Sequence, residues 1–261
     1  MDRAEQLQFL CDSLLEEMPQ YRQEARRLSG TEADRRMLLR CLMNVREPGA
    51  LPESFLRAQD ALLSAERGEK GVVSVSALPG IPGDPRLALW QGDITRLDAD
   101  AIVNAANARM LGCFRAGHNC IDNVIHSAAG LQLREECAVL MRAQGHEEPT
   151  GQAKITGGYN LPAKYVLHTV GPIISGPLTE QDRTLLASCY RSCLTLAAEK
   201  GLKSVAFCCI STGVFRFPKE EAARIAIRTV RDFLRQDSSL ERIVFCVHGG
   251  ENLRIYQKLL F

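Results

Sequence analysis

From about residue 70 onward, short apolar segments alternate with longer amphipathic ones, and this alternation constrains the fold more than any other feature. The apolar segments predict strands at residues 72–75, 87–90, 101–103, 153–156, 165–170, 204–210 and 243–247. The amphipathic segments predict helices at 121–133, 184–200, 219–235 and 251–260. Because the segment 204–210 is continuously apolar, we expect that strand to be covered on both faces. Strands that alternate with helices predict a three-layer α/β/α sandwich with a mixed central sheet.

The first 70 residues have a different pattern, which is helical throughout. Leu7, Leu10 and Leu14 recur at steps of three and four residues, the spacing of one apolar helix face. Thr31 is a candidate N-cap for a second helix, and Pro52 opens a third. Three helices of this size are marginal in isolation. We therefore expect residues 1–70 to be a helical N-terminal extension packed on a main domain at 71–261.

Charge and hydropathy exclude several classes of protein. The 261 residues carry a formal net charge of +1, which argues against nucleic-acid binding through a broad basic surface. No stretch approaches the roughly 18 apolar residues of a membrane span. The N-terminus has acidic residues and no apolar core of a signal peptide, so a cytoplasmic location is expected.

Ten cysteines in such a chain are expected to be free thiols, metal ligands or small buried apolar residues. Six of them lie in apolar segments and are predicted to be core residues: Cys137, Cys189, Cys193, Cys208, Cys209 and Cys246. Cys11 and Cys41 belong to the helical extension, and we expect them to be buried in the same way.

The common phosphate-binding and hydrolase motifs of α/β enzymes are absent from the sequence. Two polar segments nevertheless follow predicted strands, where ligands bind in open α/β sheets. The segment Gly92-Asp93-Ile94-Thr95 reads either as a turn or as part of a site. The segment Asn104-Ala105-Ala106-Asn107 offers amides suited to sugar hydroxyls, or amides that satisfy loop backbone.

Cys113, His118 and Cys120 lie within eight residues, after Gly112. Thiolate and imidazole are ligands that zinc prefers, and three protein ligands with an open fourth position are typical of a catalytic zinc ion. A redox pair and two incidental cysteines remain alternatives. Asp122 follows directly at a predicted helix start, where a carboxylate acts as a cap or as a catalytic group. His126 is expected to be a packed core residue.

A further segment, from Ser211 to Pro218, joins the apolar strand to the next helix. Its small residues allow successive backbone N–H groups to face a phosphate near a helix N-terminus. Phe215 and Phe217 are expected to flank a sugar or a base.

In this order and spacing, these segments resemble the macrodomain family of ADP-ribose binders. The resemblance spans residues 85–260 and rests on the segments 92–95, 100–107, 121–126, 128–130, 150–157 and 211–218. The insert with Cys113, His118 and Cys120 is similar to the zinc-containing branch, whose members also carry a helical N-terminal extension. Two positions depart from the common pattern. The insert replaces a glycine run before Asp122, and Arg216 stands where the common loop has a glycine.

The resemblance implies a role for each matching residue. Asp93 would accept the adenine amino group, and Ile94 would offer backbone to the same base. Asn107 would hold the distal ribose, beside one zinc ion held by Cys113, His118 and Cys120. Asp122 matches the carboxylate of hydrolytic macrodomains. The loop over the diphosphate would consist of Ser211, Thr212, Gly213, Val214 and Phe215.

The expected activity is zinc-dependent removal of mono-ADP-ribose from protein side chains, with Asn107 and Asp122 as the catalytic pair. The transition state at the distal ribose should then have oxocarbenium character, as in other glycosyl transfers. The alternatives are an ADP-ribose reader without activity and a deacetylase of O-acetyl-ADP-ribose. The resemblance points to a sirtuin-type ADP-ribosyltransferase and a lipoyl carrier protein as the first partners to test.

Overall fold

The computed structural model describes residues 1–28, 30–237 and 239–261, and its centre is a six-stranded sheet. The strand order is β1-β6-β5-β2-β4-β3. Only the pair β3–β4 is antiparallel, so the sheet is mixed, as the sequence predicts. The strands are β1 (Leu87–Gln91), β2 (Ala101–Ala106), β3 (Ala153–Gly157), β4 (Tyr165–Val170), β5 (Ser204–Phe207) and β6 (Arg242–Val247).

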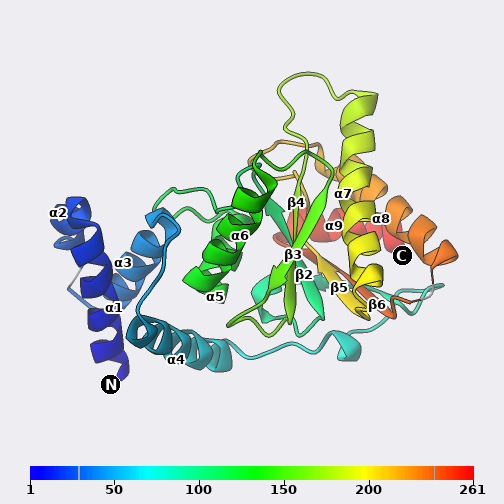
Figure 1. The fold of residues 1–261 in the computed structure, drawn as a ribbon. Helices are drawn as coiled ribbons and strands as arrows, with labels where there is room; N and C mark the ends of the chain where they lie inside the picture. Colours follow the sequence, from blue (N-terminus) through cyan, green and yellow to red (C-terminus); the bar gives the residue numbers. More distant parts are fainter. Residues whose placement is uncertain (29, 238) are drawn as a thin grey trace.

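Helices cover both faces of this sheet and complete the three-layer α/β/α architecture (Figure 1). The helices of the main domain are α5 (Ile121–Ala129), α6 (Leu131–Gln144), α7 (Glu180–Glu199), α8 (Lys219–Gln236) and α9 (Gly250–Leu260). In Figure 1, α5 and α6 lie on the side of the sheet that faces the N-terminal helices, and α7 and α8 lie on the opposite side. The predicted fold class is therefore confirmed.

The N-terminal residues form a helical unit beside α5 (Figure 1). Its helices are α1 (Arg3–Glu17), the 3-10 turn η1 (Pro19–Tyr21), α2 (Arg22–Ala25), α3 (Glu32–Val45) and α4 (Glu53–Lys70). Asp2 and Thr31 form capping boxes that fix the starts of α1 and α3. The apolar faces of α1, α3 and α4 share a core that also includes Leu131 of α6. The division of the chain at residues 70 and 71 stays a prediction.

Several predicted elements differ from the structure. Residues 72–75 form no strand: Val73 makes an isolated bridge to Leu97, and the 3-10 turn η2 (Val75–Ala77) follows. The expected helix at 121–133 is two helices, because Gly130 has a φ of 101° and breaks the helical path. The expected strand at 204–210 ends at Phe207, since β5 has pairing partners only up to that residue.

The predictions for most cysteines are confirmed. Five of the six assigned to the core are buried, whereas Cys209 is partly buried. In the extension, Cys11 is buried and Cys41 is partly buried. None of the helices in the described ranges has the length and apolar character needed to cross a membrane.

Candidate functional site

The segments singled out in the sequence lie at or after the carboxyl ends of β1, β2 and β5, which are parallel members of one sheet. Ligands bind at this edge in open α/β sheets. The strand β2 is longer than predicted and contains Asn104, which pairs with His168 of β4. Asn104 is therefore a residue of the sheet and not of a loop, and strand pairing fixes its backbone.

Asp93 lies directly after β1, at the start of the 3-10 turn η3 (Ile94–Arg96). Its Oδ1 accepts hydrogen bonds from the backbone N–H of Thr95 at 3.0 Å and from the Thr95 hydroxyl at 2.7 Å. Among the described residues nothing donates to Oδ2, so one acceptor atom remains for a ligand. Gly92 is required here, because a Cβ would lie 2.3 Å from the Trp90 ring. Ile94 is buried beneath the turn.

Cys113, His118 and Cys120 come together in the loop before α5. Their three ligand atoms lie within 4.8 Å of one another, and the Cys113 Sγ is 3.3 Å from the His118 Nδ1. All three side chains are partly buried, so an ion held between them would keep access to a substrate. Asn123 on α5 supports the loop: its Oδ1 accepts the Cys113 N–H at 3.0 Å, and its own N–H faces the Cys120 Sγ at 3.4 Å.

This donor set fits zinc in type and number, with three ligands of the thiolate and imidazole kind. Burial raises the pKa of the Cys120 thiol, and the neighbouring Cys113 raises it further. The thiol therefore stays protonated without an ion, and zinc must displace its proton.

A second group of possible ligands lies deeper, under α5 and α6. His126, Cys137 and His168 are buried with ligand atoms within 4.8 Å of one another. Both nitrogens of His168 already have partners, Asn104 at 3.1 Å and Thr156 at 2.9 Å. Burial, followed by the nearby positive charge of Arg134, lowers the pKa of His126 well below its usual value. The group suits a packed core better than a metal, in line with the prediction for His126.

Asp122 occupies the first turn of α5 and is 4% exposed. Its two oxygens accept hydrogen bonds from the side-chain amides of Asn104 at 2.8 Å and Asn107 at 3.2 Å. Burial raises the pKa of Asp122 to about 6, although the hydrogen bond from Asn104 and the charge of Arg134 oppose that rise. The carboxyl thus has a fixed orientation and a pKa close to neutral, as acid–base chemistry requires.

The side chain of Asn107 makes more hydrogen bonds within the protein than the sequence predicts. Its amide N–H group donates to the Gly112 carbonyl at 2.8 Å as well as to Asp122, and its Oδ1 accepts from the Arg109 N–H at 3.0 Å. The residue therefore joins the carboxyl to the start of the Cys113–Cys120 loop.

The loop after β5, which is predicted to face a phosphate, has backbone N–H groups without a partner among the described residues. The N–H groups of Gly213, Val214 and Phe215 make no hydrogen bond to the described residues, whereas the Thr212 N–H binds the Cys209 carbonyl at 3.3 Å. Ser211 and Arg216 have φ values of 63° and 59°. Arg216 thus adopts a left-handed conformation that favours glycine. Phe217 is wrongly predicted as a ligand contact, because it is buried in the core.

Gly171, at the end of β4, controls the position of this loop. A Cβ at Gly171 would lie 2.0 Å from the Ser211 hydroxyl oxygen and 2.9 Å from the Ile210 side chain. We expect Gly171→Ala to displace Ser211 and to weaken ADP-ribose binding roughly tenfold, a cost of about 1.4 kcal/mol. Calorimetric titration with ADP-ribose measures the change, and an unaltered dissociation constant would show that the loop position is unimportant for binding.

A cavity of about 550 Å³ lies between the extension and the main domain. The main domain contributes Asp93, Thr95 and Val124 to its lining, and α3 contributes Met37 and Arg40. This volume is typical of a small-molecule site. Since Asp93 lines it, the extension forms one wall of the space next to the predicted adenine contact.

Four residues that shape this region are not predicted from the sequence: Arg40, Asn44, Asn123 and Arg134. Asn123 follows Asp122 directly, and this position beside a candidate catalytic residue could have marked it as part of the site. The contacts of Arg40 and Asn44 with the loop span more than 70 residues of sequence, and no local pattern reveals them.

Comparisons with known proteins identify relatives of this chain. The family model described as Macro domain matches residues 103–226. A protein-ADP-ribose hydrolase of Treponema medium is 51% identical over 262 residues, covering 100% of both chains. A protein of the same name from Staphylococcus aureus (strain MSSA476) is 51% identical over 222 residues, 85% of this chain and 83% of that protein.

A Trypanosoma brucei macrodomain in complex with ADP-ribose is similar in structure. It superposes with a TM-score of 0.67 and 34% identity over 85% of this chain and 95% of that chain. The chain therefore belongs to the macrodomain family.

Proposed function

We propose that this protein is a zinc-dependent hydrolase that removes mono-ADP-ribose from modified protein side chains. One observation carries the proposal. The loop before α5 brings the ligand atoms of Cys113, His118 and Cys120 within 4.8 Å of one another, and the buried carboxyl of Asp122 follows two residues after Cys120, in the first turn of the helix. The relatives named protein-ADP-ribose hydrolase support the activity, and the partly buried ligand set supports the metal.

Each residue would have a defined part in the reaction. Asp93 and the Ile94 backbone would bind adenine, and the N–H groups of Gly213, Val214 and Phe215 would face the diphosphate. Ser211 and Thr212 complete that loop. Water is added across the bond at the anomeric carbon of the distal ribose, and the protein side chain leaves with a proton.

Asp122 would accept the proton of the attacking water, with its orientation set by Asn104 and Asn107. Asn107 would also contact the distal ribose. Bound zinc would supply Lewis-acid polarisation of an oxygen, or lower the pKa of bound water to about 7. Cys113, His118 and Cys120 would hold the ion with three protein ligands, the number typical of a catalytic zinc site.

The decisive experiment compares two substrates and measures the metal in the same preparation. The purified protein is incubated with a mono-ADP-ribosylated protein and, separately, with O-acetyl-ADP-ribose. We expect free ADP-ribose from the modified protein and one zinc ion per chain. Release of acetate alone would indicate a deacetylase, and binding of ADP-ribose without any release would indicate a reader module.

The chemistry of the site does not identify the protein that carries the ADP-ribose, so candidate carrier proteins are tested directly. We propose a cytoplasmic location, and a lipoyl carrier protein modified by a sirtuin-type ADP-ribosyltransferase as the first substrate to assay. Release of ADP-ribose from that carrier, compared with an unrelated modified protein, measures the preference.

Asp93→Ala is expected to separate binding from chemistry. The substitution removes the acceptor for the adenine amino group, far from the bond that is broken. We expect the dissociation constant for ADP-ribose to rise about 10- to 100-fold, the loss of one charge-assisted hydrogen bond of about 1.5–3 kcal/mol, with kcat nearly unchanged. A fall in kcat with unaltered binding would contradict this role.

A further inference from the structure

Helix α3 of the extension contacts the loop of Cys113, His118 and Cys120 at two points. The Gly117 N–H donates to the Asn44 Oδ1 at 3.2 Å. The Arg40 guanidinium donates from Nη2 to the Asn119 Oδ1 at 2.6 Å. Gly117 and Asn119 are the residues on either side of His118. The first contact holds the loop backbone directly before His118, and the second holds the side chain of the residue directly after it.

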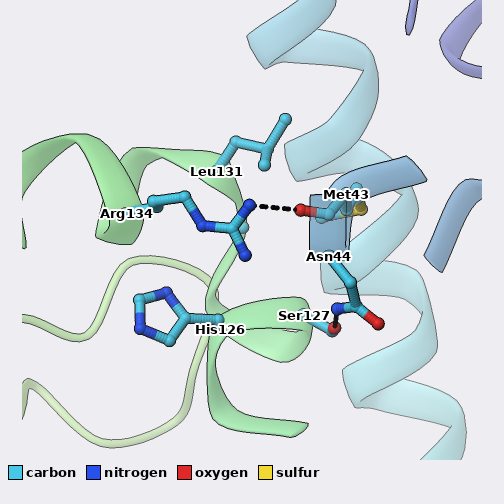
Figure 2. A pocket seen from close by; sticks show the side chains of 7 residues that line it. Met43, Asn44, His126, Ser127, Leu131 and Arg134 are labelled. Atoms are coloured by element: carbon cyan, nitrogen blue, oxygen red, sulfur yellow. Dashed lines mark hydrogen bonds between the residues drawn. The ribbon is translucent and has the colours of Figure 1, made fainter. Parts of the chain in front are cut away.

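Asn44 is 1% exposed and joins the loop to α5. While its Oδ1 accepts from Gly117, its Nδ2 donates to the Ser127 hydroxyl at 3.0 Å (Figure 2). The approach of loop and helix is close: a Cβ at Gly117, which has a φ of 66°, would lie 3.3 Å from the Cys41 Sγ. One buried amide therefore fixes three segments relative to one another.

Arg134 of α6 holds the same C-terminal end of α3 that carries Asn44. Its Nη1 donates to the carbonyls of Met43 and Arg46, each at 2.6 Å, and Figure 2 shows the bond to Met43. These carbonyls lie at the C-terminus of α3, where a cation is favoured. The guanidinium also lies 4.8 Å from the centre of the Phe114 ring, in the same loop. The loop, α3 and α6 thus form one connected network.

The loop needs this support because it has no helix or strand of its own. Asn123 of α5 holds its beginning at Cys113 and Arg115 and its end at Cys120. The middle, with His118, is held by α3. We infer that the N-terminal extension is part of the metal site, with Arg40 and Asn44 as positioning residues for His118.

This inference rests on the proposed function for the identity of the ion, and its test needs no substrate. Zinc affinity is measured by competition with a chromogenic chelator for the full-length protein. Arg40→Met and Asn119→Ala remove the same contact from opposite sides. We expect each to raise the zinc dissociation constant about tenfold, as for other residues that orient metal ligands. Because they break one shared contact, the double variant should be no weaker than either single variant.

The matched control is Arg35→Met, the same chemical change on α3 at a residue that makes no hydrogen bond to the described loop residues. It is expected to keep the wild-type zinc affinity. Arg40→Lys retains a cationic donor and should restore most of the affinity. The absorption spectrum of the Co²⁺-substituted protein should shift in Arg40→Met and Asn119→Ala, and stay unchanged in Arg35→Met.

The outcomes separate the two proposals. Arg40→Met and Asn119→Ala proteins that bind zinc as the wild type does would overturn the role of α3. A zinc-loaded wild type that releases no ADP-ribose, with the affinity losses still present, would overturn the activity and leave the role of α3 intact. A wild-type chain that binds no zinc would overturn both.

Discussion

Replacing Cys113, His118 or Cys120 with alanine is expected to abolish zinc binding and to lower kcat by about three orders of magnitude. The reason is the loss of metal electrostatics, which supply several kcal/mol in the transition state, and about 4 kcal/mol corresponds to this factor. Metal analysis and ADP-ribose release are measured on the same preparation. Binding of ADP-ribose should change much less, because Asp93 and the loop at 211–215 would make most of the contacts.

A matched control for these variants is Cys193→Ala, which makes the same change at a fully buried core cysteine. It is expected to keep its zinc and its activity, at some cost in stability. Treatment of the wild type with a strong chelator should reproduce the ligand variants, and added zinc should restore turnover. Metal-free protein that works at the wild-type rate would exclude zinc from the reaction.

The affinity for zinc should also depend on pH, in a direction set by the thiols. Since burial raises the pKa of Cys120, the proton must leave when zinc binds. Below that pKa, the apparent affinity falls as the pH falls, by up to about tenfold per pH unit for each displaced proton. Acid should therefore release the metal, and chelator competition at several pH values measures the slope.

The second large effect is expected for Asp122→Asn. The amide keeps the size of the side chain but cannot accept a proton, so kcat should fall about 10²- to 10⁴-fold, the usual contribution of a general base. Zinc content and ADP-ribose affinity should stay near wild-type values. Single-turnover release of ADP-ribose measures the chemical step, separately from product release.

Asn107→Ala provides a companion to this variant. The substitution removes one of the two amides that hold Asp122 and leaves Asn104 in place. We expect a smaller loss than for Asp122→Asn, because the carboxyl keeps one anchor. Full activity in Asp122→Asn would transfer the role of base to another group and would remove the carboxyl from the mechanism.

The sequence indicates which segments form the candidate site better than it indicates how the residues around them pair and pack. The segments after β1, β2 and β5 were singled out because small and polar residues follow apolar strands, and local sequence carries that signal. The sequence predicts Asn104 to follow the strand, because the pattern of β2 does not reveal where pairing with β4 stops. The sequence predicts Phe217 as a ligand contact, and this is wrong because burial of an aromatic ring depends on partners distant in sequence.

The sequence by itself determined the layered α/β fold, the helical extension and the grouping of Cys113, His118 and Cys120. These depend on periodicity and short spacing, which are local properties. Only the tertiary structure decided that the middle of the loop is held by Arg40 and Asn44, and that Asp122 is buried between two amides. Hydrogen bonds between segments 73 and 79 residues apart arise from how helices pack, and packing is set by the whole chain at once.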